Sequence, residues 1–192
     1  MLGQLGLADV AIVVCDSLVE HALAQGSYNQ RRGECEAGVR ILARHRPAIR
    51  ALRDVGEAEL AEHRSELPDD VYRRCRHVVT ENARVAAAVA ALEARDLTRL
   101  GELLRASHES LRGDYAVSCP ELDLLVEAAL DQPGVHGSRM MGGGFGGSTI
   151  SLVDPGAVAT LGAALGERYR QAYGKEPRVR VCRSADGAGR WG

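Results

Sequence analysis

Apolar residues recur along the chain at two different spacings, and each spacing predicts a different type of element. Short β-branched or alternating runs predict strands at residues 10–15, 148–153 and 178–182, and one that ends near Met141. Apolar steps of three and four predict helices at residues 27–45, 57–65, from Asp70 onward, 97–112, 120–130 and 157–173. Helices packed on one face of a small antiparallel sheet would make this an α+β protein.

The helix that starts near Asp70 has the clearest pattern. Its apolar stripe is interrupted by polar Asn82 and consists of Val71, Cys75, Val78, Val85, Val89 and Leu92. Asp96 is placed to cap the next helix, so the two helices are predicted to form an antiparallel hairpin. Ser118, Pro120 and Glu121 predict a capping box at the start of the helix that follows. The inner face of that helix is predicted to be Leu122, Leu125, Val126 and Ala129.

Composition and charge narrow the class of protein. The 192 residues, 45% of them hydrophobic and 26% charged, suit one soluble domain or one domain with part of another. No apolar run approaches the roughly 20 residues of a membrane span, and the first residues lack the basic segment of a signal peptide. The formal charge of −2 gives no reason to expect nucleic acid as a partner.

The cysteines and histidines predict no metal site and no disulfide scaffold. The five cysteines are an odd number at wide spacing without a C-x-x-C pair, which indicates reduced thiols and a cytoplasmic protein. The six histidines also lack the spacing typical of zinc ligands.

One segment is unusually rich in glycine. In "RMMGGGFGGST", the glycines Gly142, Gly143, Gly144, Gly146 and Gly147 surround Phe145. The run that follows predicts a strand, whereas a dinucleotide fingerprint needs a helix there, and no Lys follows the last glycine as in a Walker loop. Two interpretations stay open: a loop that offers backbone N–H groups to an anion, and a hairpin without a ligand.

Longer blocks resemble one family. "EHALAQGSYNQRRGECE", "RRCRHVVTENARV", "SHESLRGDYAVSCPELDLLV" and "GSRMMGGGFGGSTISLV" are similar, in order and spacing, to the C-terminal half of galactokinases in the GHMP kinase superfamily. The resemblance covers nearly all of the chain. It implies a ferredoxin-like sheet in a C-terminal domain at residues 49–192, preceded at residues 1–48 by the last strand and helix of an N-terminal kinase domain.

The resemblance implies ATP-dependent phosphorylation of galactose to galactose 1-phosphate with Mg²⁺, which is mainly a task of positioning and charge neutralisation. In this family the glycine loop Gly142–Gly147 lies beside the cleft and supports the nucleotide phosphate loop. Tyr28 matches a tyrosine that reaches the sugar. Two positions depart from the family: Met141 stands where Thr is usual, and Ser148 where Cys is common.

Other polar residues suggest catalysis only superficially. Ser107 and His108 are helical neighbours whose side chains diverge, so we interpret them, with Asp114, as packing and capping residues. Glu81 and Asn82 are interpreted as a polar crossing within the helix hairpin.

The resemblance also implies that essential parts lie elsewhere. Galactokinases place the sugar-binding motif, the serine-rich phosphate loop and the catalytic aspartate before the region that this chain matches. We therefore expect no catalytic residue here and an inactive fragment whose strand at residues 10–15 presents unpaired edges. The alternatives are a non-catalytic binding or regulatory module that pairs with a separate N-terminal half, and a GHMP kinase for another sugar.

Overall fold

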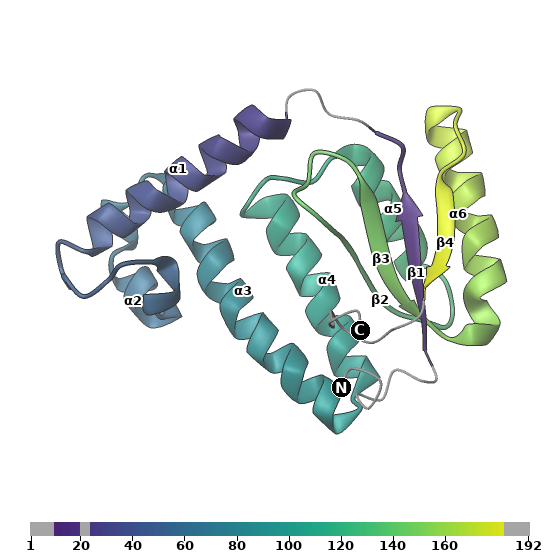
Figure 1. Ribbon diagram of the computed structural model, residues 1–192, viewed down its shortest axis with the longest axis horizontal. Coiled ribbons are helices and arrows are strands. Elements are labelled where there is room, and N and C mark those ends of the chain that lie inside the picture. Colours follow the sequence, from purple (N-terminus) through teal and green to yellow (C-terminus); the bar gives the residue numbers. More distant parts are fainter. Residues whose placement is uncertain (1–9, 20–23, 183–192) are drawn as a thin grey trace, which may run out of the picture.

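The structure is a computed structural model that describes residues 10–19 and 24–182 (Figure 1). Its strands are β1 (Ala11–Asp16), β2 (Val135–Met140), β3 (Ser148–Val153) and β4 (Arg178–Cys182). Its α-helices are α1 (Ala24–Leu42), α2 (Glu57–Glu62), α3 (Asp69–Ala94), α4 (Leu97–Gly113), α5 (Pro120–Leu130) and α6 (Val158–Tyr173). Short 3₁₀ helices occur at η2 (Leu52–Asp54), η3 (Arg64–Glu66) and η4 (Pro155–Ala157). The predicted strands and helices are thus present, with ends shifted by a few residues.

The described residues form one antiparallel sheet in the order β2-β3-β1-β4. With α5 directly before β2 and α6 directly before β4, this is the ferredoxin-like arrangement that the resemblance implied. The expectation of unpaired edges on the first strand is wrong. Val13 in β1 pairs with Ser151 of β3 on one side and Val181 of β4 on the other. Both partners are more than a hundred residues away in sequence, which is why the local pattern did not reveal them.

Each face of the sheet packs against helices. Val13, Cys15 and Val153 point toward α5 and α6, where they meet Leu125 and Leu161 in a buried core. This is the layer of helices that was expected. The neighbouring Leu152 points the other way, into a second cluster with Leu100 and Leu103 of α4, as the alternation of strand side chains requires. Helix α4 therefore covers part of the opposite face, along β2 (Figure 1).

Helices α1, α2 and the first half of α3 form a lobe at the end of the molecule away from the sheet (Figure 1). Its core contains Leu42, Ile49, Leu52, Val55, Leu60, Leu67, Cys75 and Val79. The proposed domain boundary at residue 48, which stays a prediction, falls within this cluster. The N-terminal nine residues, on which we based the absence of a signal peptide, lie outside the described residues. No helix of the described chain has the length and apolar character needed to cross a bilayer.

Helix ends and faces agree only in part with the sequence patterns. Asp96 caps α4, because its carboxylate accepts a hydrogen bond from the Arg99 N–H at 2.8 Å. The capping box at Ser118 is wrong: Cys119 is the residue before α5, and Ser118 donates to the Asp123 carboxylate instead. The inner face of α5 was predicted correctly, since Leu122, Leu125, Val126 and Ala129 are all buried.

The apolar stripe of α3 was only partly right. Val85 and Val89 are 59% and 50% exposed. The α3–α4 hairpin forms as predicted, and α3 contributes Ala87, Ala88, Ala91 and Leu92 to the cluster there, so only Leu92 comes from this end of the predicted stripe. A spacing of three and four identifies an apolar face without showing that a partner covers it.

Candidate functional site

The glycine loop is a hairpin turn between β2 and β3. The Met141 N–H donates to the Ser148 carbonyl at 2.9 Å, which closes the hairpin. Gly142, Gly144 and Gly147 have φ values of 83°, 86° and 85°, a region that L-residues with side chains rarely adopt. A strand follows the loop, so the exclusion of a dinucleotide fold is confirmed.

Backbone contacts hold the loop against two other segments. The Phe145 N–H donates to the Val117 carbonyl at 2.6 Å, and a Cβ atom on Gly144 would overlap that same carbonyl oxygen. At the far end, Ser17 donates from both its N–H (2.9 Å) and its hydroxyl (2.7 Å) to the Gly147 carbonyl. The loop is therefore fixed in position relative to β1 and to the segment before α5.

Tyr28 lies in α1 and is 56% exposed. It borders a hollow of about 540 Å³ together with Arg32, Cys35 and Tyr115. Burial raises the pKa of Tyr115 to about 12, so its phenol stays protonated at neutral pH. Tyr28 is thus available to a ligand.

The segment at residues 115–117 connects the two predicted site elements. The Arg31 guanidinium of α1 donates to the Ala116 carbonyl at 3.3 Å. The next carbonyl, that of Val117, accepts the bond from Phe145 in the glycine loop. One turn of α1, which carries Tyr28, and the loop Gly142–Gly147 are thus both attached to one short segment. No local pattern in the sequence indicates this connection, because it joins residues far apart in the chain.

The residues that we assigned to packing do not form a catalytic group. Ser107 donates to the Glu81 carboxylate at 2.6 Å, whereas His108 Nδ1 accepts from the Met140 N–H at 3.3 Å. Both side chains are buried, and they contact different partners. Asp114 binds Arg76 and Ser110, beside the end of α4.

The prediction that Glu81 and Asn82 form a polar crossing within the helix hairpin is half right. Glu81 contacts Ser107 of α4, while Asn82 is exposed. Burial raises the pKa of Glu81, but the Ser107 hydrogen bond and the nearby Arg84 outweigh it, so the pKa lies below its usual range. Arg139 of β2 joins this network through Ser107, at 2.9 Å, a role that sequence reasoning missed.

Comparisons with known proteins support the resemblance. Residues 88–171 match the family model "GHMP kinases C terminal". The chain is 50% identical over 181 residues to the galactokinase of Roseiflexus sp. (strain RS-1), covering 94% of this chain and 46% of that protein. It is 44% identical over 179 residues to the Homo sapiens galactokinase, covering 93% and 43%. The chain thus spans about half the length of these relatives.

Solved structures agree with the sequence matches. The crystal structure of Lactococcus lactis galactokinase complexed with galactose superposes with a TM-score of 0.86 at 36% identity, over 91% of this chain and 45% of that one. The Leishmania major mevalonate kinase, at 18% identity and a TM-score of 0.51, shares the fold alone. The chain therefore matches the GHMP kinase C-terminal family over residues 88–171 and is similar, along nearly its whole length, to about half of the length of the galactokinases compared.

Proposed function

We propose that this chain forms one wall of the cleft in which a galactokinase-like enzyme transfers the γ-phosphoryl group of ATP to galactose. The observation that carries the proposal is the attachment of α1, with Tyr28, and of the glycine loop to residues 116 and 117. The proposed sugar contact, Tyr28, and the glycine loop, proposed to lie beside the phosphates, are thereby held at fixed positions relative to each other. The galactokinase similarity supplies the substrate class.

Tyr28 is proposed as the sugar contact. Its phenol is solvent-accessible and can donate to or accept from a sugar hydroxyl, while its ring offers an apolar edge. Substrate discrimination through one such contact is modest, so we propose that most selectivity comes from the other half of the enzyme.

The glycine loop is proposed to support the nucleotide phosphate loop rather than to form the main phosphate cradle. The Phe145 N–H, at the centre of the loop, already donates to Val117 and is not available to an anion. ATP and Mg²⁺ would be bound mostly by the N-terminal half. The groups that fix the loop are backbone amides, carbonyls and one hydroxyl. These are not the carboxylate ligands that Mg²⁺ prefers.

The chain alone is proposed to be inactive. Phosphoryl transfer needs a base or positioning residue for the attacking hydroxyl and donors around all three phosphates. The described residues around the loop bring together neither set. A second proposal is that the chain is a binding module that docks onto a separate N-terminal half. A GHMP kinase for another sugar is a further alternative, because the similarity of the wall does not specify the sugar.

Two measurements test these proposals. We expect titration calorimetry with ATP to show no saturable binding to the chain alone, and we expect no galactose phosphorylation. Micromolar ATP binding or activity of the chain alone would contradict the proposal. Activity on mixing the chain with the separately produced N-terminal half of the Roseiflexus galactokinase would favour the docking module. Phosphorylation of a different sugar in that mixture would favour the other GHMP kinase.

A further inference from the structure

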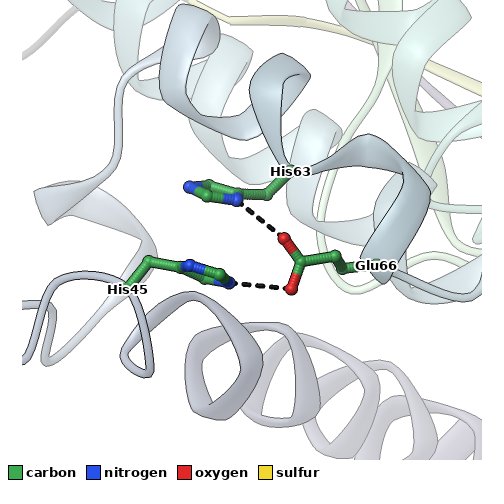
Figure 2. Close-up of side chains that lie close together, drawn as sticks. All are labelled: His45, His63 and Glu66. Atoms are coloured by element: carbon green, nitrogen blue, oxygen red, sulfur yellow. Dashed lines mark hydrogen bonds and ion pairs between the residues drawn. The ribbon is translucent and has the colours of Figure 1, made fainter.

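We propose that His45, His63 and Glu66 form a binding site for a first-row divalent transition metal ion, with Zn²⁺ as its representative. The three side chains converge on the surface of the helical lobe (Figure 2). This lobe lies at the end of the molecule away from the sheet and its glycine loop (Figure 1). His45 follows the C-terminal end of α1, whereas Tyr28 lies near the other end, roughly 20 Å away along the helix, so the site is separate from the proposed sugar contact and independent of the proposed function.

The ligand atoms already lie close together. His45 Nε2 is 2.7 Å from one oxygen of Glu66, and His63 Nδ1 is 3.0 Å from the other. All three ligand atoms lie within 4.8 Å of one another. Around a tetrahedral Zn²⁺ with bonds of about 2.0–2.2 Å, neighbouring ligand atoms are about 3.4 Å apart. No two of these ligand atoms therefore lie more than about 1.4 Å farther apart than a zinc site requires.

The backbone beneath the ligands is well fixed. His45 follows the end of α1, and its N–H donates to the Leu42 carbonyl at 3.1 Å. His63 ends α2, and the Glu66 N–H donates back to the His63 carbonyl, also at 3.1 Å. Leu42, Leu60 and Leu67, which flank the ligands in sequence, are at most 3% exposed in the core of the lobe. Because this backbone is already ordered, metal binding loses less conformational entropy than it would at a mobile segment.

The chemistry of the donor set selects the class of ion. Two imidazoles and one carboxylate match the catalytic type of zinc site, in which a water completes the coordination. Imidazole nitrogen suits Zn²⁺, Cu²⁺ and Ni²⁺, whereas Mg²⁺ and Ca²⁺ prefer oxygen ligands. The Mg²⁺ that a kinase uses should therefore not occupy this site.

Both rings must turn about their side-chain torsions to bind one ion, because the lone pair of a ring nitrogen lies in the ring plane and two nearly parallel rings do not aim at a shared point. They stack with centroids 4.0 Å apart and an interplanar angle of 22°, each with one nitrogen toward the carboxylate (Figure 2). Because an ionised carboxylate only accepts, a neutral ring holds its proton on the nitrogen that faces Glu66. Metal binding would move that proton to the other nitrogen of each ring. The side chains of His45, His63 and Glu66 all reach solvent, with 39%, 16% and 44% of their surfaces exposed, so an ion can enter.

The sequence did not indicate this site. The two histidines are separated by η2 and α2 along the chain, a distance that matches no common zinc motif. Their proximity arises because α2 and η3 fold back against the end of α1 (Figure 1).

Zinc binding to the purified chain tests the proposal. A titration of ZnCl₂ against a competing colorimetric chelator should give one equivalent bound with a dissociation constant below about 10 μM. His45→Gln and His63→Gln should each weaken this binding at least tenfold. His136→Gln is the matched control, because His136 pairs with a single carboxylate, that of Asp154, at 2.8 Å. It should leave zinc binding unchanged, and MgCl₂ should not compete.

A second measurement uses the unaltered protein and does not depend on the folding of a variant. In ¹⁵N NMR of the histidine rings, one equivalent of Zn²⁺ should shift the nitrogens of His45 and His63 and leave those of His136 in place. The absence of such shifts would overturn the proposal. Zinc binding that persists undiminished in the His45→Gln/His63→Gln double variant would also overturn it, because other groups, such as the free thiols, would then bind the ion.

Discussion

Ser17 and Gly147 join the end of strand β1 to the end of the glycine loop. The Ser17 N–H and hydroxyl both donate to the Gly147 carbonyl, and the Ser17 side chain is fully buried. A further bond reaches the same residue from α6, where the Tyr169 hydroxyl donates to the Ser17 carbonyl at 2.7 Å. Ser17 therefore links the glycine loop to both β1 and α6.

Replacing Ser17 with Ala should destabilise the protein by about 1–2 kcal/mol, because the bond from the buried Ser17 hydroxyl to the Gly147 carbonyl is lost while the N–H bond remains. Urea unfolding followed by circular dichroism measures the change. Thr160→Ser, on an exposed part of α6, is the control and should alter the free energy of unfolding by less than about 0.5 kcal/mol. An equally small change for Ser17→Ala would contradict the assigned role.

The three glycines at the start of the loop should respond differently to Ala. Gly144→Ala combines positive φ with overlap at the Val117 carbonyl and should cost at least about 2 kcal/mol. Gly142→Ala has the positive φ but open space, and should cost about 1–2 kcal/mol. Gly143→Ala has neither constraint and should change stability by less than about 0.5 kcal/mol.

Thermal unfolding of these three variants, made side by side, is the measurement. Equal effects at all three positions would show that the loop does not keep the described conformation.

His77 should make the protein less stable in mild acid. Burial lowers the pKa of His77 to about 4, and only 6% of the residue is exposed. Its ring also contacts the Ser110 hydroxyl at 3.0 Å and stacks on Tyr115. As pH falls from about 6.5 toward 4, the unfolded chain takes up a proton on this ring that the folded chain does not. Folding stability should therefore decrease over that range.

The expected loss from this group between pH 7 and pH 5 is about 2 kcal/mol. Urea unfolding at both pH values, on the wild type and on His77→Gln, isolates it, since other groups titrate in both proteins. The variant should lose about that much less stability than the wild type over the same step. An identical pH dependence in the two proteins would show that His77 titrates normally.

Much of the fold follows from local patterns. The spacing of apolar residues predicted the strands and helices. The alternation in residues 148–153 correctly predicted a strand after the glycine loop, which made the loop a connection between two strands. The local pattern did not predict the central place of β1, because each of its pairings joins residues more than a hundred positions apart. It also predicted a buried stripe on α3 where Val85 and Val89 are exposed.

The candidate site was less accessible to sequence reasoning. Motif similarity drew attention to Tyr28 and to Gly142–Gly147, but it gave no physical reason for their relation. That relation depends on residues 116 and 117, whose carbonyls accept from Arg31 and Phe145. Ala116 has a positive φ of 50°, a local conformation that its residue type does not predict. Hydrogen bonds between distant backbone groups leave no pattern in a single sequence.

The central claim is that this chain supplies a working wall of a galactose-phosphorylating cleft. Its most direct test is a fusion of the N-terminal half of the Roseiflexus galactokinase, up to the point where the similarity begins, to this chain. We expect the fusion to phosphorylate galactose with ATP, and Tyr28→Ala to raise the KM for galactose at least tenfold with little change in the KM for ATP. A folded fusion without galactose kinase activity, or with activity indifferent to Tyr28→Ala, would contradict the claim.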